Sequence, residues 1–124
     1  MLTTLIVDDE MLIRWAVAES LTAAGFAVLQ AGSAGEALER FAGRVGPIAV
    51  VVLDLRLPDS SDFTLLRRIH AIDPDCKVIL MTADGTPGVL DAAVSAGAYC
   101  ALAKPFDMHE IAGLVRQAAV ANFP

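Results

Sequence analysis

The chain has 124 residues, of which 56% are hydrophobic, and a formal net charge of −6. This length suits one domain with one substantial core, and every apolar run is shorter than the roughly 18 residues of a membrane span. The acidic balance argues against binding of a nucleic-acid backbone. The start at Met1–Thr4 lacks the basic segment of a secretory signal. The two cysteines are too few for a disulfide framework or a zinc site.

Short apolar runs alternate with helical patterns along the whole chain. The runs that we predict as strands are 5–7, 27–29, 48–53, 78–81 and 99–102. The segments with apolar residues at helical spacing are 12–24, 34–41, 65–72, 87–96 and 108–118. This alternation predicts an α/β fold, a parallel sheet with helices on both faces. Five such units suit a doubly wound, five-stranded sheet of order 2-1-3-4-5 with five helices.

Several local signals indicate where helices begin and end. Gly25 predicts a helix stop, and the segment Ser33–Glu36 predicts a capping box in which the two side chains satisfy each other's amides. Thr86 before Pro87 predicts an N-cap followed by proline at the first helical position. We expect residues 1–120 to form one domain and residues 121–124 to begin a linker or a C-terminal tail.

Polar residues stand where the apolar strands end. Asp8 and Asp9 follow the first strand, Asp54 follows the third, Thr82 follows the fourth, and Lys104 follows the fifth. The carboxyl ends of parallel strands share one edge, and ligands bind there beside the switch point of the strand order. The sequence therefore predicts one pocket with three carboxylates, one hydroxyl and one ammonium.

This set of groups indicates phosphoryl chemistry. Three neighbouring carboxylates repel one another unless a cation joins them. Mg²⁺ suits the cluster because it binds oxygen ligands, often one or two carboxylates together with a phosphoryl oxygen. A carboxylate such as Asp54 can act as a nucleophile and form an acyl phosphate, and Thr82 and Lys104 can stabilise the phosphoryl oxygens.

Each of these residues also has a plainer interpretation. Asp8 or Asp9 alone would suit a helix N-cap, and Asp54 alone would suit a turn at a strand end. Thr82 alone would suit a β-branched strand position, and Lys104 alone would be a solvated loop charge. Their common place at the strand ends favours the site.

Four segments resemble, in order and spacing, the receiver domain of two-component response regulators: Val7–Glu10, Leu53–Asp59, Met81–Ala83 and Lys104–Phe106. The resemblance covers essentially the whole chain and implies a flavodoxin-like, CheY-like fold. The segment Gly97–Asp107 is also similar to receivers of the NtrC-like activators that work with sigma-54 polymerase.

The resemblance implies a role for each site residue. Asp54 would be the phosphoacceptor, taking a phosphoryl group from a histidine of a sensor kinase or phosphotransfer protein. Asp9, Asp54 and the backbone carbonyl of Arg56 would coordinate Mg²⁺, with Mn²⁺ as an alternative, and Asp8 would act through the metal's waters. Thr82 and Lys104 would bind phosphoryl oxygens.

Three further positions concern the loops around the site. The resemblance implies a cis peptide bond at Lys104-Pro105, which X-Pro bonds permit at small cost. Arg56 and Asp84 would flank the pocket mouth, either as a surface ion pair or as residues that tune loss of the phosphoryl group. Ala101 stands where the family usually has an aromatic residue, so the ring that is usually coupled to the threonine is missing at this position.

The resemblance implies a cytoplasmic signalling domain and not an enzyme, apart from its own phosphorylation and dephosphorylation. It would switch an output domain of transcriptional type in a longer chain, or a partner protein. The face formed by 87–96, 99–102 and 108–118 is a candidate for homodimer formation. Two rivals are an aspartyl phosphatase or phosphotransferase, which normally has a second acid where Leu55-Arg56 stand and a cap insertion, and an interaction module of this fold that is not phosphorylated.

Overall fold

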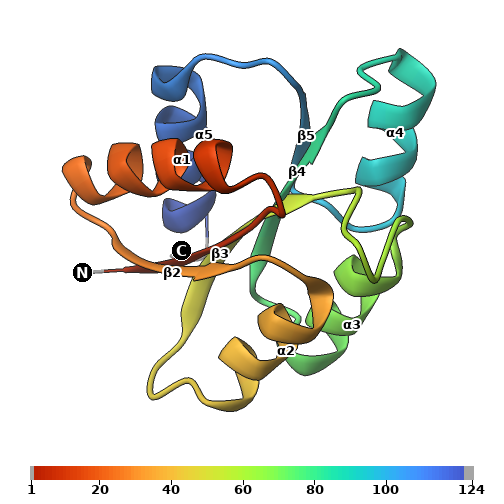
Figure 1. The fold of residues 1–124 in the computed structure, drawn as a ribbon. Helices are drawn as coiled ribbons and strands as arrows, with labels where there is room; N and C mark the ends of the chain where they lie inside the picture. The colour runs from red at the N-terminus through yellow and green to blue at the C-terminus, as the bar shows by residue number, and fades with distance from the viewer. Residues whose placement is uncertain (1, 122–124) are drawn as a thin grey trace.

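The computed structural model describes residues 2–121 and contains one parallel sheet within them. The strand order is β2-β1-β3-β4-β5, which confirms the predicted doubly wound topology (Figure 1). Among the described residues, none of the helices has the length and hydropathy of a membrane span. The strands are β1 (Thr3–Val7), β2 (Ala27–Ala31), β3 (Ile48–Asp54), β4 (Lys77–Thr82) and β5 (Cys100–Ala103). The helices are α1 (Met11–Ala23), α2 (Ala34–Ala42), α3 (Thr64–Ile72), α4 (Pro87–Ser95) and α5 (Met108–Val120).

The sheet lies between two helical layers. Helices α1 and α5 cover one face, and α2, α3 and α4 cover the other (Figure 1). The central strand β3 contributes to both cores, with Val50 and Val52 in the layer of α1 and α5 and Val51 and Leu53 in the other layer. A strand covered on both faces needs apolar residues at every position, which explains its uninterrupted hydrophobic run. The predicted tail lies outside the described residues from 122 onward.

The start of α2 and the end of α1 follow the predicted signals with one difference. Gly25 has a φ of 97°, in the left-handed region that glycine adopts at a helix end. The Ser33 hydroxyl accepts a hydrogen bond from the Glu36 amide at 3.1 Å. The Glu36 carboxylate, however, accepts from the amide of Gly32 at 2.8 Å and not from that of Ser33. The cap is therefore one residue wider than the capping box that we predicted.

The predicted cap of α4 forms in another way. Thr86 makes no side-chain cap hydrogen bond before Pro87. The carboxylate of Asp84 instead accepts from the Thr86 amide at 3.1 Å, which folds the loop between β4 and α4 onto itself. At the start of α5, the Asp107 carboxylate accepts from the amide of His109 at 2.7 Å.

Several expected bounds and exposures differ from the structure, among them that β1 begins at Thr3 and β2 ends at Ala31. The last strand ends at Ala103, one residue later than predicted, because Ala103 pairs with Thr82 of β4. Leu12 fits the apolar period of α1 but is 81% exposed, and Trp15 one turn later is 59% exposed. The buried residues of α1 lie in its second half and include Val17 and Leu21. Periodicity therefore placed the helix correctly and Ile13 on its inner side, but it did not predict the exposure of Leu12.

Thr4 gives a direct test of the core. Its side chain is fully buried on β1, and its hydroxyl oxygen has no hydrogen-bond partner among the described residues. An unpaired buried hydroxyl costs about 1–3 kcal/mol relative to an apolar group of the same shape. We therefore expect Thr4→Val to raise the free energy of unfolding by about 1 kcal/mol, measured by urea denaturation. Thr3→Val, at a partly exposed position, serves as control. A lower stability of Thr4→Val would contradict the assignment.

Candidate functional site

The ammonium of Lys104 lies among three carboxylates at the carboxyl edge of the sheet. Its Nζ atom is 3.0 Å from an oxygen of Asp8, 3.1 Å from one of Glu10 and 3.2 Å from one of Asp54. One positive charge therefore meets three negative groups, and the cluster keeps an excess of negative charge. The predicted meeting of Asp8, Asp54 and Lys104 is present in the structure.

The strand register brings these residues together although they are far apart in the sequence. Val7 of β1 pairs with Leu53 of β3, so the residues that follow β1 lie beside the end of β3. Strand β4 separates β3 from β5, and the backbone amide of Lys104 donates to the carbonyl of Thr82 at 2.7 Å. The side chain of Lys104 then reaches Asp54 across the end of β4. The Lys104-Pro105 peptide bond is cis, as the family resemblance implied.

Asp8 is the most enclosed of the acids. Its side chain is fully buried, one carboxylate oxygen accepts from the Glu10 amide at 2.9 Å, and the other pairs with Lys104. Its backbone carbonyl accepts from the guanidinium of Arg14 at 2.8 Å. Both oxygens of Asp8 are thus engaged within the protein, which suits a group that shapes the site more than one that binds a ligand directly.

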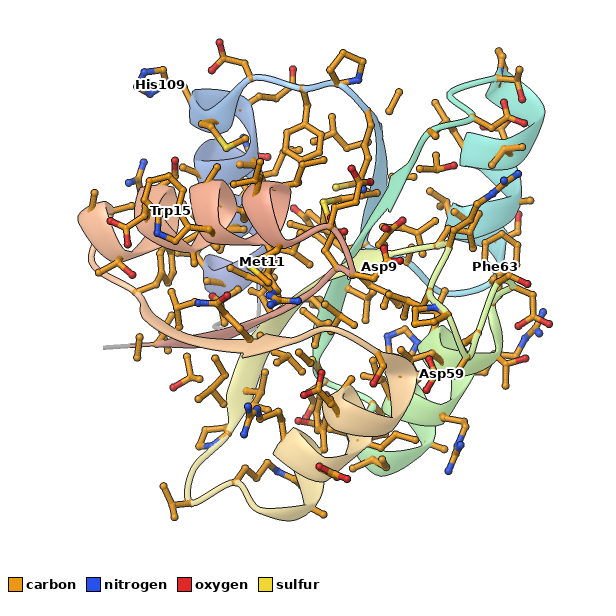
Figure 2. All side chains as sticks on the ribbon, viewed as in Figure 1. Asp9, Met11, Trp15, Asp59, Phe63 and His109 are labelled. Carbon is orange, nitrogen blue, oxygen red and sulfur yellow. The ribbon has the colours of Figure 1, made fainter. Side chains whose placement is uncertain are left out.

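Asp9 is exposed and lies at the same edge of the sheet (Figure 2). In the described part of the chain, its carboxylate makes no hydrogen bond or ion pair. It lines a cavity of about 210 Å³ that is open to solvent. The other lining residues are Glu10, Asp54, Arg56, Ala83 and Lys104. Asp9 is therefore free to bind a ligand in the cavity beside Asp54.

The environment of Asp54 changes its acidity. The side chain is nearly buried, and burial raises its pKa from 3.8 to about 6, against the lowering effects of the Arg56 amide and the Lys104 charge. The Arg56 amide donates to one carboxylate oxygen at 3.1 Å. Burial by itself would lower the pKa of Lys104. The hydrogen bonds of Lys104 to Asp8 and Glu10 and the nearby carboxylate charges outweigh this effect and raise its pKa. Lys104 therefore stays an ammonium.

Of the two residues Thr82 and Arg56, only Arg56 lines the cavity. Thr82 is buried at the end of β4, and its hydroxyl accepts from the Asp84 amide at 3.0 Å. It does not belong to the residues that line the cavity. Arg56 does line the cavity. It forms no ion pair with Asp84 within residues 2–121, because the Asp84 carboxylate is directed to Thr86 in its own loop.

Glu10 is the residue that sequence reasoning did not include in the site. Carboxylate oxygens of Asp8, Glu10 and Asp54 lie within 4.8 Å of one another and form a group that suits a metal ion. Glu10 immediately follows the two acids that were predicted, so the run of three acids was the signal available. All the side-chain donors are hard carboxylate oxygens, the ligand type that Mg²⁺ prefers.

Comparisons with known proteins agree with this geometry. Residues 4–116 match the response regulator receiver domain family. The chain is 38% identical over 116 residues to the DNA-binding transcriptional regulator NtrC of Escherichia coli (strain K12), covering 91% of this chain and 24% of NtrC. It is 34% identical over 113 residues to sporulation initiation phosphotransferase F of Bacillus subtilis (strain 168), covering 91% of this chain and 90% of that protein.

Solved structures of receiver domains also resemble this fold. The structure of a response regulator receiver domain protein from Clostridium thermocellum superposes with a TM-score of 0.89 at 30% identity, covering 98% of this chain and 96% of that one. The 38% identity to NtrC confirms the predicted similarity to NtrC-like receivers. The chain spans about a quarter of the length of NtrC, 24%, so it corresponds to one part of that regulator. The chain belongs to the response regulator receiver domain family, the signalling domain of two-component systems.

Proposed function

We propose that Asp54 accepts a phosphoryl group from the phosphohistidine of a sensor kinase or a phosphotransfer protein. The observation that supports this proposal is the position of the Asp54 carboxylate. It ends the central strand nearly buried, faces the cavity, and lies 3.2 Å from the Lys104 ammonium. In the transfer, a carboxylate oxygen bonds to phosphorus as the phosphorus–nitrogen bond breaks, and the imidazole leaves with the bonding electron pair and takes up a proton.

A divalent cation fits the residues present. Receiver domains bind Mg²⁺ at an acidic pocket, and here the carboxylates outnumber the ammonium. We assign direct coordination to Asp9, Asp54 and the backbone carbonyl of Arg56, as the family resemblance implies. The three residues line the same cavity, which supports the assignment, and Glu10 lines it as well. Asp8 acts through the metal's waters, because it is fully buried and does not belong to the residues that line the cavity. When bound, Mg²⁺ supplies positive charge beside the phosphoryl oxygens, and Mn²⁺ can replace it.

Lys104 and Thr82 complete the set on the other side of Asp54. The Lys104 ammonium already contacts Asp54, so it lies where negative charge would increase on phosphorylation. The Thr82 hydroxyl accepts a bond from Asp84 and keeps its own proton to donate. A phosphoryl oxygen that draws in this hydroxyl would pull on the loop between β4 and α4. We propose that the switch travels through this loop, because Ala101 offers no aromatic ring to move.

The chain acts as a signalling domain, and its chemistry is its own phosphorylation and dephosphorylation. We propose that residues 1–120 form the receiver unit in the cytoplasm and that residues 121–124 lead toward a transcriptional output domain, as the length of NtrC suggests. The face of α4, β5 and α5 is the candidate dimer surface. Val94 is 52% exposed and Tyr99 is 38% exposed there, which supports a partner on this face.

Phosphorylation by acetyl phosphate tests the acceptor. With Mg²⁺ present, the wild type should gain the mass of one phosphoryl group in an acyl linkage that acid and base both hydrolyse, and Asp54→Asn should gain none. Asp62→Asn removes an exposed acid from the following loop and should behave as the wild type. Equal phosphorylation of Asp54→Asn would refute the assignment.

Metal titration tests the ligands. Asp9→Asn should weaken Mg²⁺ binding more than Asp8→Asn, for which loss of an indirect partner is expected to cost about tenfold in affinity. Glu10→Gln is measured beside Asp9→Asn, because Glu10 belongs to the carboxylate cluster and is the alternative direct ligand. The measurement is isothermal titration calorimetry of each folded variant. If Glu10→Gln has the largest effect and Asp9→Asn has none, Glu10 is the ligand in place of Asp9.

The raised pKa of Asp54 predicts how stability depends on pH without metal. Because the folded state holds this proton up to about pH 6 and the unfolded state releases it near 3.8, the contribution of Asp54 to stability falls as pH rises between these values. Asp54→Asn should therefore be more stable than the wild type at pH 8 by about 1–3 kcal/mol, and the difference should shrink toward pH 4. Urea unfolding across pH measures it, and a less stable Asp54→Asn at pH 8 would contradict the prediction.

A further inference from the structure

We propose that Asp59 is a positioning residue for the metal and phosphoryl site, because it ties the loop that carries the Arg56 carbonyl to the start of α2. This inference rests on the proposed function of Asp54 and Arg56. Asp59 itself does not belong to the residues that line the cavity, and its carboxylate is hydrogen-bonded to α2. Its role would be to hold the backbone through which Arg56 reaches the metal.

The carboxylate of Asp59 makes two hydrogen bonds to another element. One oxygen accepts from the amide of Ala34 at 2.8 Å, and the other accepts from the amide of Gly35 at 2.9 Å. These are the first two residues of α2, whose amides have no partner within the helix. Figure 2 shows Asp59 beside the start of α2, away from Asp9. A negative group at a helix N-terminus is also favoured by the helix dipole.

Asp59 is the part of this cap that comes from elsewhere in the chain. Ser33 and Glu36 satisfy the neighbouring amides from within the α2 segment. The helix thus has local caps of its own, and the bonds of Asp59 span 25 and 24 residues. A contact over this distance in sequence restricts the loop as well as the helix.

The other end of the loop is fixed at the sheet. The amide of Leu55 donates to the carbonyl of Met81 at 2.9 Å, and the amide of Arg56 donates to Asp54. Leu57 and Ser60 exchange two backbone hydrogen bonds, which form a tight turn with Asp59 inside it. Arg56 therefore lies between an anchor at the sheet and an anchor at α2. A backbone carbonyl cannot turn toward a ligand by changing a side-chain rotamer, so its place depends on both anchors.

Asp62 offers a matched control in the same loop. It is exposed and acidic like Asp59, but its carboxylate binds within its own turn, where it accepts from the amide of Thr64 at 2.9 Å and from the Thr64 side chain. A substitution there changes the charge by the same amount and leaves the contact with α2 intact. Ala34→Pro tests the contact from the opposite side. It removes one amide donor at the first helical position, where proline is tolerated, and Ser33 before it is already extended.

The experiment measures Mg²⁺ affinity by calorimetry and amide exchange over residues 55–60 in the metal-free protein. We expect Asp59→Ala to lower the affinity by about tenfold and to speed exchange at Leu57 and Ser60. Ala34→Pro should give a smaller change in the same direction, and Asp62→Ala should give none. If Asp59→Ala fails to fold, Ala34→Pro decides the question by the same two measurements.

The outcomes separate this inference from the function on which it rests. Unchanged affinity and exchange in folded Asp59→Ala, beside a wild type that binds Mg²⁺, would overturn the positioning role and leave Asp59 as a helix cap. An equal loss of affinity in Asp62→Ala would also overturn it, because the effect would then be one of charge. A wild type that binds no Mg²⁺ would overturn the proposed function and this inference together.

Discussion

The contact between one ammonium and three carboxylates is the interaction on which this site depends. Lys104 lies about equally far from Asp8, Glu10 and Asp54, at an edge where two of the three acids are nearly or fully buried. Without that positive charge, like charges would face one another with little water to screen them. The strand order of the sheet makes the contact, because it places the ends of β1 and β3 together and leaves only β4 between β3 and β5.

The balance of charge also explains why the site should accept a cation and a phosphoryl group. One ammonium compensates one of the three carboxylates, and the raised pKa of Asp54 reflects its burial. On the proposed function, a divalent cation would take over part of the compensation and leave Lys104 free to follow the new negative charge. Two loops would then hold the groups around the phosphoryl group in place. Asp59 ties the loop after β3 to α2, and the carboxylate of Asp84 accepts from the Thr86 amide within the loop after β4.

Most of the fold followed from the sequence, because each strand contains a short apolar run and a polar residue follows that run. Thr4, a polar residue buried within β1, is an exception to the apolar pattern. The same rule predicted that Asp8, Asp54 and Lys104 would meet. Two contacts could not be predicted: Glu10 joins the carboxylate cluster, and Asp59 binds the start of α2. Both depend on loop paths and side-chain rotamers, and the periodicity of apolar residues carries no information about these. The exposure of Leu12 has a similar origin, because the fully buried positions of α1 lie in its second half and Ile13 is only partly buried.

A structure determined with Mg²⁺ and beryllofluoride, which mimics a phosphoryl group, would test the central claim most directly. The account predicts beryllium bound to a carboxylate oxygen of Asp54, fluorides in contact with Lys104 and the Thr82 hydroxyl, and Mg²⁺ held by Asp9, Asp54 and the Arg56 carbonyl. Beryllofluoride on another carboxylate, or a site that stays empty while Mg²⁺ is bound elsewhere, would contradict it.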